Sequence, residues 1–115
     1  METGHLDITG MGLVCCLGQG VNTVYRRMCR GETGFRPIDR FPPDPYPQKN
    51  AGQLPRDVEK PLRDRFPEDD LAKAMILTAA EEACGGAVAS GTGNDRLGLV
   101  LATNFGPMET LEWCW

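Results

Sequence analysis

The sequence predicts a mixed α/β fold for this chain of 115 residues. An apolar segment near the N-terminus runs into a glycine-rich turn and then into a helical pattern. A second helical pattern lies beyond the middle of the chain, and a strongly apolar run follows it. Strand and helix signals in this order are typical of helices that cover a mostly buried sheet.

Residues 6–14 are expected to form the first strand. Leu6 and Ile8 alternate with Asp7, and the glycines that follow interrupt this alternation and predict a turn. A strand, a glycine-rich turn and a helix in this order occur in many nucleotide and phosphate sites. The turn therefore has to be tested against that chemistry.

A helix is predicted over residues 21–30, where the apolar side chains recur at the i, i+3, i+4 and i+7 positions of one face. These side chains are Val21, Val24, Tyr25 and Met28. We expect the helix to begin at Gly20 or Asn22 and to end at Gly31.

A proline-rich excursion is predicted at about residues 31–69, which hold eight of the nine prolines. The stretch FPPDPYP cannot be a central strand or a helix interior, so the excursion is interpreted as irregular. Within it, QKNAGQL is compatible with a short extended piece at a sheet edge.

The strongest helix signal covers residues 69–85, which open on two carboxylates at the positive end of the helix dipole and close on glycine. A stripe of mostly small residues follows one face, and we expect it to let a neighbouring element approach closely. The stripe consists of Ala72, Met75, Ile76, Ala79, Ala80 and Ala83.

Residues 97–103, LGLVLAT, predict a strand buried on both faces, because the run is almost continuously apolar and is bounded by turns. The stretch NFGPMETLEWCW adds a glycine turn and the start of a helix. The chain stops inside this apparent helix, so we expect a truncated chain or the N-terminal segment of something larger.

The charge balance argues against a nucleic-acid partner. Twelve basic and sixteen acidic residues give a formal net charge of −4, whereas phosphate binding needs a clustered basic face. Arg26, Arg27 and Arg30 share one predicted helix, and we interpret them as a solvated or partner-facing patch. No apolar run is long enough for a membrane span, and no signal peptide is visible.

The cysteines indicate a reduced, cytoplasmic chain. Their number, five, is odd, none is spaced as CxxC, and His5 is the single histidine. We therefore expect no structural disulfide, no metal and no cofactor. Cys15 and Cys16 precede a helix, but residues 17–20 separate them from its first turn, so structural thiols are favoured over a nucleophile.

The dinucleotide-binding pattern G-x-G-x-x-G is incomplete. Gly10 and Gly12 fit it, but Cys15 takes the third glycine position, and the acidic residue expected downstream would be Glu32, in a turn.

The loop ATNFGPMET lies where open α/β sheets bind ligands. Its spacing alone favours a tight turn in which Phe105 fills core space.

Four segments in register carry a family resemblance. They are ITGMGLVCCLGQGVNTVYRRMCRGETGFRPIDRF, YPQKNAGQL, LAKAMILTAAEEA and RLGLVLATNFGPMETLE. Together they resemble the N-terminal portion of the β-ketoacyl-acyl-carrier-protein synthases, the condensing enzymes of thiolase fold. In that family the glycine turn shapes the fold and holds no nucleotide. Cys15 and Cys16 replace its usual Ser/Thr-Pro pair.

The resemblance implies a partial thiolase-like fold, the N-terminal segment of an αβαβα architecture over residues 1–115. The complete enzyme of fatty acid or polyketide biosynthesis would accept an acyl group on a cysteine and condense it with malonyl-acyl carrier protein. The family's nucleophile and histidines come later in its chain, so no catalytic residue is carried over, and the segment alone is expected to be inactive. The alternative is a non-catalytic homologue that serves as a structural or interaction subunit.

The resemblance also implies an acyl carrier protein as partner, and a homodimer or a paired synthase subunit. Phe105 matches a family position that lines or gates the acyl pocket, where a phenyl ring would shorten the accessible space. Ala102, Asn104 and Pro107 depart from the family's glycine-rich loop and would stiffen it. Residues 63–66 stand in for an Arg-Met/Leu-Asp-Arg-Phe run.

Overall fold

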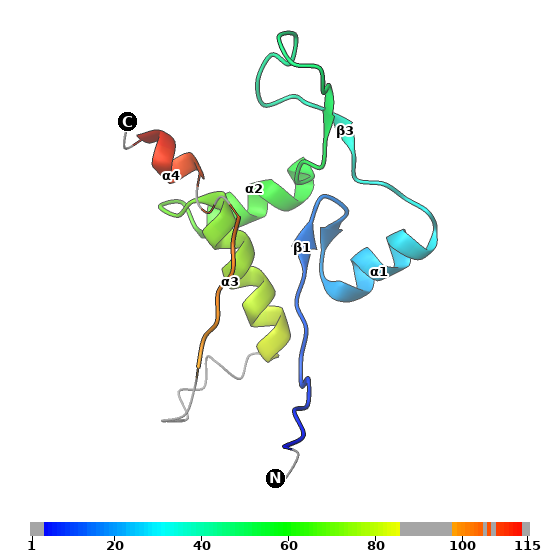
Figure 1. Ribbon diagram of the computed structural model, residues 1–115, viewed down its shortest axis with the longest axis vertical. Helices are drawn as coiled ribbons and strands as arrows, with labels where there is room; N and C mark the ends of the chain where they lie inside the picture. Colours follow the sequence, from blue (N-terminus) through cyan, green and yellow to red (C-terminus); the bar gives the residue numbers. More distant parts are fainter. Residues whose placement is uncertain (1–3, 86–97, 105, 107, 114–115) are drawn as a thin grey trace.

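The computed structural model describes residues 4–85, 98–104, 106 and 108–113, and their arrangement is mixed α/β (Figure 1). In chain order the elements are β1 (Val14–Cys15), β2 (Gly18–Gln19), α1 (Val21–Cys29), β3 (Arg36–Pro37), β4 (Asn50–Ala51), α2 (Arg56–Arg65), α3 (Leu71–Cys84) and α4 (Met108–Trp113). None of the described helices is long and apolar enough to cross a bilayer.

The strand predicted over residues 6–14 is wrong for most of its length. Only Val14 is in a strand, where β1 pairs antiparallel with β2 through Val14↔Gln19 and Cys15↔Gly18. Leu6 and Ile8 are exposed and unpaired. A strand exists only when a neighbour takes up its backbone hydrogen bonds. The Leu13 carbonyl accepts from the Gly20 N–H at 2.8 Å, but no described segment pairs with residues 6–12.

The prediction of α1 is confirmed almost to the residue. Gly20 occupies the N-cap with φ +90°, and Gly31 follows the helix with φ +72°. Both backbone conformations lie in the region that favours glycine. Of the predicted apolar face, Val24 is buried, whereas Tyr25 and Met28 remain exposed.

The excursion is less irregular than its prolines suggest, because α2 lies within it. Pro55 occupies the N-cap position and Pro61 lies inside the helix. The helix forms in spite of Pro61 because Leu62 is buried against α3, and tertiary packing outweighs local propensity. The extended piece expected in QKNAGQL is confirmed as β4, which pairs antiparallel with β3.

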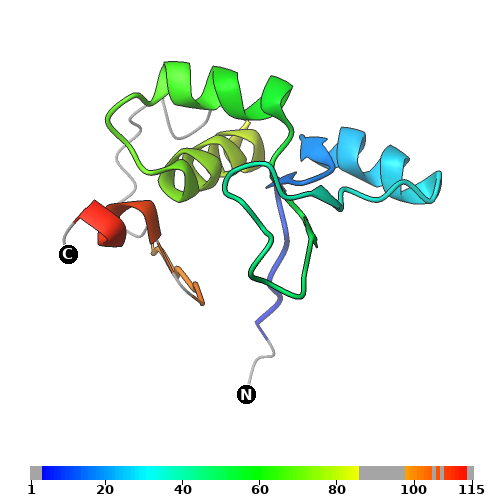
Figure 2. The same ribbon diagram turned by 90° about the horizontal axis from the view of Figure 1, so that it is seen from above.

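The core lies between α2 and α3, which are stacked against each other in the view from above (Figure 2). The prediction of α3 is confirmed, with Asp70 at the N-cap and Gly85 in a left-handed conformation at the C-cap. Leu54, Leu62 and Ala74 form the buried cluster. Partly buried side chains pack around it: Val14, Val58, Phe66, Leu71 and Met75.

The buried strand predicted at residues 97–103 does not form over the part that the structure describes. Residues 98–104 are in no strand, and Leu99 and Val100 are 88% and 96% exposed. As with residues 6–13, an apolar run becomes a strand only beside a partner. The helix start predicted after this run is confirmed as α4.

Candidate functional site

The loop before α4 is the segment that the sequence resemblance associates with an acyl pocket. Phe105 and Pro107 lie outside the described residues, so the predicted role of Phe105 is not tested. Around them the Thr103 hydroxyl accepts a hydrogen bond from the Gly106 N–H at 2.9 Å. Gly106 has φ +61°, and its carbonyl accepts from the Met108 N–H at 3.0 Å. The chain thus turns sharply as it enters α4.

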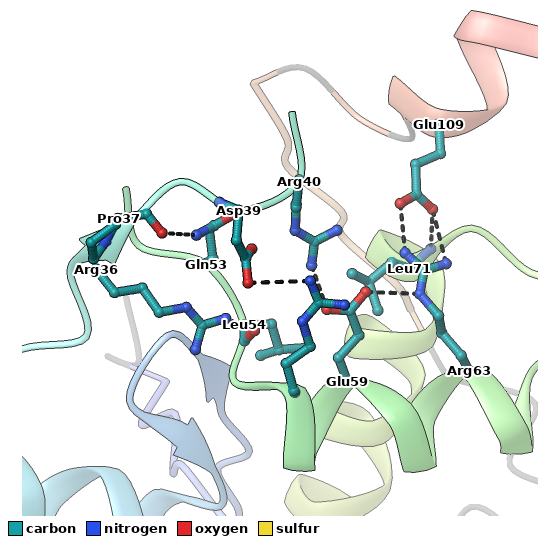
Figure 3. Close-up of polar contacts among 11 residues, drawn as sticks. Arg36, Pro37, Asp39, Arg40, Gln53, Leu54, Glu59, Arg63, Leu71 and Glu109 are labelled. Carbon is teal, nitrogen blue, oxygen red and sulfur yellow. Dashed lines mark hydrogen bonds and ion pairs between the residues drawn. The ribbon is translucent and has the colours of Figure 1, made fainter. Parts of the chain in front are cut away.

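Glu109 joins α4 to the first turn of α3 (Figure 3). Its Oε2 accepts a hydrogen bond from the Leu71 N–H at 3.2 Å, and its Oε1 accepts from the Arg63 guanidinium of α2 at 2.7 Å. Leu71 opens α3, where backbone N–H groups have no partner inside the helix. A carboxylate from α4 therefore satisfies a free donor of α3.

Asp70 makes the reverse connection, from α3 to α4. Its Oδ1 accepts from the Ala72 N–H at 2.8 Å, as an N-cap residue does. Its Oδ2 accepts from the N–H and the hydroxyl of Thr110 at 3.0 and 3.2 Å. Each helix thus supplies a carboxylate to the first turn of the other. We call Arg63, Asp70 and Glu109 the helix clamp.

The helix clamp continues into a row of alternating charges. Arg63 Nε donates to Glu59 at 2.8 Å, and the other Glu59 oxygen accepts from Arg40 at 2.5 Å. Figure 3 shows this row, from Arg40 in the excursion through Glu59 and Arg63 on α2 to Glu109 on α4. Because neighbouring charges have opposite sign, each contact in the row is attractive, and the row ties three parts of the chain together.

The electrostatics of the helix clamp hold Glu109 ionised. The hydrogen bond from Arg63 is the main cause that lowers the pKa of Glu109, and the Leu71 N–H acts in the same direction. Burial and the charge of Asp70 oppose these effects. Glu109, followed by Glu59, raises the pKa of Arg63. An ionised carboxylate that is fully engaged as an acceptor positions other groups and is poorly suited to proton transfer.

A shallow, mostly apolar groove follows α3 from the helix clamp. One hollow of about 230 Å³ lies against the start of α4, lined by Asp70, Leu71, Ala72, Met75, Gly106, Met108 and Glu109. A second of about 310 Å³ lies beside the N-terminal segment, lined by Gly12, Leu13, Val14, Ala72, Met75, Ile76 and Ala79. Ala72 and Met75 line both, so the two hollows adjoin each other along α3.

The N-terminal segment approaches α3 so closely that only glycine fits. A Cβ atom on Gly10 would lie 1.7 Å from the carbonyl oxygen of Ala83, and one on Gly12 would lie 1.7 Å from that of Ala79. The close approach predicted for the small-residue stripe is therefore confirmed. The glycines that suggest a nucleotide-binding turn serve helix packing instead.

Glu82 occupies the place that a phosphate would need in a nucleotide site. Its two carboxylate oxygens accept hydrogen bonds from the N–H groups of Leu13 and Val21 at 2.9 and 2.8 Å. Val21 opens α1, and the N-cap residue Gly20 has no side chain to offer. Because a carboxylate already neutralises this helix N-terminus, a phosphate there would meet like charge.

The thiols of Cys15 and Cys16 are half-buried, where the sequence predicts structural cysteines. Cys16 packs against the excursion: a Cβ on Gly34 would lie 2.5 Å from its Sγ, and one on Gly52 would lie 3.2 Å from it. His5 is exposed. Within the described part of the chain, no three His, Cys, Asp or Glu residues are grouped as metal ligands would be.

Sequence reasoning missed the long-range roles of three carboxylates. Asp70 precedes a helical pattern, which is the signal of an N-cap, but its bond to Thr110 carries no local signal. Glu109 and Glu82 sit in ordinary helical surroundings, and their partners lie 38 and 69 residues away in the chain. Such contacts are decided by tertiary packing.

Comparison with known proteins relates the chain to the 3-oxoacyl-acyl-carrier-protein synthases. Synthase 2 of Staphylococcus aureus (strain N315) is 31% identical over 121 residues, 96% of this chain. Synthase 2 of Coxiella burnetii is 26% identical over 117 residues, 97% of the chain. The chloroplastic synthase I of Hordeum vulgare is 49% identical over 47 residues, 41% of the chain.

The chain spans little more than a quarter, 28%, of the length of each of the two bacterial relatives, and its match to the barley protein covers 10% of that protein. No protein-family model matches the chain. No solved structure matches it.

Proposed function

We propose that the chain is the N-terminal segment of a β-ketoacyl-acyl-carrier-protein synthase of fatty acid or polyketide biosynthesis. The observation that carries the proposal is the similarity to synthase 2 of Staphylococcus aureus over 96% of the chain. In the complete protein an acyl group passes from the carrier thioester to a cysteine, and the carrier thiol leaves. Malonyl-carrier then loses CO₂, and its carbon attacks the new thioester and releases the cysteine.

The surface of the chain supports a role as part of a larger domain. Its accessible surface is 9830 Å², whereas a compact protein of this mass exposes about 6,200 Å². Its radius of gyration is 17.3 Å, against about 13 Å for a compact chain of this length. Leu99 and Val100 are apolar and unpaired, as strands of an incomplete sheet would be. In this proposal further polypeptide completes a thiolase-like fold around them.

In this proposal residues 1–115 and the remainder of the protein contribute different parts of the site. The nucleophile and the histidines of the reaction lie in the remainder of the protein. Residues 1–115 supply the loop before α4, on which Phe105 lines the acyl pocket and limits its depth. The acyl carrier protein is the partner, and self-association or pairing with a second synthase subunit completes the site. The proposed compartment is a reducing one such as the cytoplasm, because the five cysteines are odd in number and none is spaced as CxxC.

Two measurements on the natural protein test the proposal. Its intact mass should far exceed the 12.6 kDa of this chain, and incubation with an acyl-carrier thioester should add the mass of one acyl group. Alkylation of thiols before incubation should abolish the addition. A folded, monodisperse product of 12.6 kDa that takes up no acyl group would contradict the proposal and favour a non-catalytic subunit.

A further inference from the structure

We infer that the exposed face of α1 is an interface to polypeptide that follows this chain in the natural protein. The face is formed by Val21, Tyr25 and Met28, and Arg26 and Arg30 lie beside it. The covering surface presents apolar side chains to the first three residues and carboxylates to the two arginines. The inference rests on the proposed function, because it takes the chain as the N-terminal segment of a longer protein.

The apolar face of α1 is mostly bare. Val21, Tyr25 and Met28 recur at the i, i+4 and i+7 positions and so share one side of the helix. Tyr25 and Met28 are 65% and 61% exposed, whereas Val24 is buried. The first turn of α1 is bonded to Glu82 of α3, and from there the helix extends away from α2 and α3 (Figure 1; Figure 2). None of the described helices therefore covers this face.

A helix as short as α1 depends on tertiary contacts. Isolated helices shorter than about 12 residues are marginal in water, and most helical stability in proteins comes from packing of the apolar face. The nine residues of α1 bury Val24 and are held by two hydrogen bonds, from the Val21 N–H to Glu82 and from Arg27 to the Leu17 carbonyl. These contacts leave Tyr25 to be covered by another surface.

The charge around this face predicts an acidic partner surface. Residues 21–38 hold four arginines and one acidic residue, Glu32, a formal charge of +3 in a chain whose net charge is −4. Glu32 engages Arg27 at 2.6 Å, and Arg30 lies 3.9 Å from it and is mostly exposed. Arg26 is exposed and makes no ion pair with any described residue. Carboxylates placed opposite Arg26 and Arg30 would find free donors, whereas basic side chains would be repelled.

The size of the face favours a segment of the same protein over a second molecule. Nine residues make a helix about 14 Å long, whereas a stable complex buries about 800 Å² on each partner. One side of α1 is too small to supply that area. A covalently connected segment needs less, because it avoids most of the loss of translational and rotational freedom. The two bacterial relatives are long enough to hold such a segment, since the chain spans 28% of each.

The experiment is hydroxyl-radical footprinting of the natural protein, read by mass spectrometry at Tyr25 and Met28. Each modification rate is compared with the rate of the same side chain in the urea-unfolded protein. We expect both rates to fall more than about fivefold on folding, because a covered side chain is shielded from water. Exposures of 65% and 61% by themselves predict falls of about twofold or less, so a fall below about fivefold in either residue would overturn the inference. Tyr46, which is 56% exposed, is the internal reference for a surface tyrosine.

Arg26→Glu tests the acidic chemistry of the partner surface. The reversed charge faces like charge, so the fall in the Tyr25 rate should shrink to about twofold. Arg26→Gln, which only removes the charge, is the milder variant if the reversal prevents folding. Lys60→Glu is the matched control, because Lys60 is also an exposed cation on a helix and makes no ion pair with any described residue. A folded Arg26 variant in which Tyr25 stays as protected as in the control would overturn the inference.

Dilution distinguishes the remainder of the protein from a second molecule. Protection of Tyr25 that stays constant over about a hundredfold dilution supports the inference, whereas protection that is lost identifies a second molecule and overturns it. The proposed function fails by a different result, a natural protein that takes up no acyl group whether or not Tyr25 is protected. A natural protein of 12.6 kDa overturns both, because it holds no further polypeptide.

Discussion

Gly12 passes so close to Ala79 that a Cβ atom on Gly12 would lie 1.7 Å from the Ala79 carbonyl oxygen. Gly10 has the same relation to Ala83, one turn further along α3. Glycine is required at these two positions because the backbone of the N-terminal segment rests directly on the helix. The requirement is steric and needs no ligand.

Gly12→Ala should therefore be strongly destabilising. The added methyl group meets backbone atoms, which cannot rotate away as a side chain can, so the segment has to lift from α3. We expect the free energy of unfolding of the natural protein to fall by about 3 kcal/mol, measured by urea denaturation. Gly4→Ala is the control, because Gly4 is exposed and nothing lies within 4 Å of a Cβ there; a similar loss in both variants would refute the steric explanation.

Glu82 should stabilise the hairpin of β1 and β2, because it accepts hydrogen bonds from the backbone N–H groups of Leu13 and Val21 on either side of it. Glu82→Gln keeps one acceptor oxygen and should cost about 1 kcal/mol, whereas Glu82→Ala should cost about 2 kcal/mol. Faster exchange of the Leu13 and Val21 amides should accompany both losses. In the control, Glu81→Gln, only a surface pair with Arg65 is broken, and those two amides should exchange as in the wild type.

Two prolines of α2 should respond in opposite directions to replacement by alanine. Pro61 lies in the helix interior, where it lacks an N–H and crowds the preceding turn, so Pro61→Ala should stabilise by about 1 to 3 kcal/mol. Pro55 lies at the N-cap with φ −58°, a value that its ring already imposes. Pro55→Ala should cost up to about 1 kcal/mol. Thermal unfolding of both variants measures the two stability changes. A change of the unfolding temperature in the same direction in both variants would contradict the different roles given to the two prolines.

The contribution of Glu109 to stability should depend on pH in acid. Its pKa is lowered from the ordinary 4.5 in the folded protein, so folding favours the ionised form. The stabilisation is then fully present above pH 4.5 and is lost as the pH falls through the lower, folded-state pKa. Arg63 stays charged throughout, because its pKa is raised.

We expect wild type and Glu109→Gln to differ by about 1 kcal/mol at neutral pH, a modest value because both partners of the ion pair are more than a third exposed. The difference should vanish in strong acid. Urea denaturation of both proteins over this pH range measures it. A difference that stays constant with pH would show that the charge of Glu109 does not contribute.

The local elements of this protein could be predicted from its sequence. The spacing of apolar residues and the flanking glycines determined α1 and α3 within about a residue or two, because helix periodicity and caps are properties of neighbouring residues. The small residues of α3 indicated a close contact for the same reason. The proline count, in contrast, concealed α2, whose formation depends on the burial of Leu62 against another helix.

Only the tertiary structure decided which distant groups meet. Glu82 accepts a hydrogen bond from the Leu13 N–H, and Asp70 accepts one from the Thr110 N–H in the first turn of α4. Nothing near any of these residues in the sequence signals the partner. The same dependence explains residues 6–13 and 98–103, whose apolar pattern is that of strands but which lie in no strand. A helix satisfies its hydrogen bonds within its own segment, whereas a strand or a long-range cap exists only when a second segment is brought beside it.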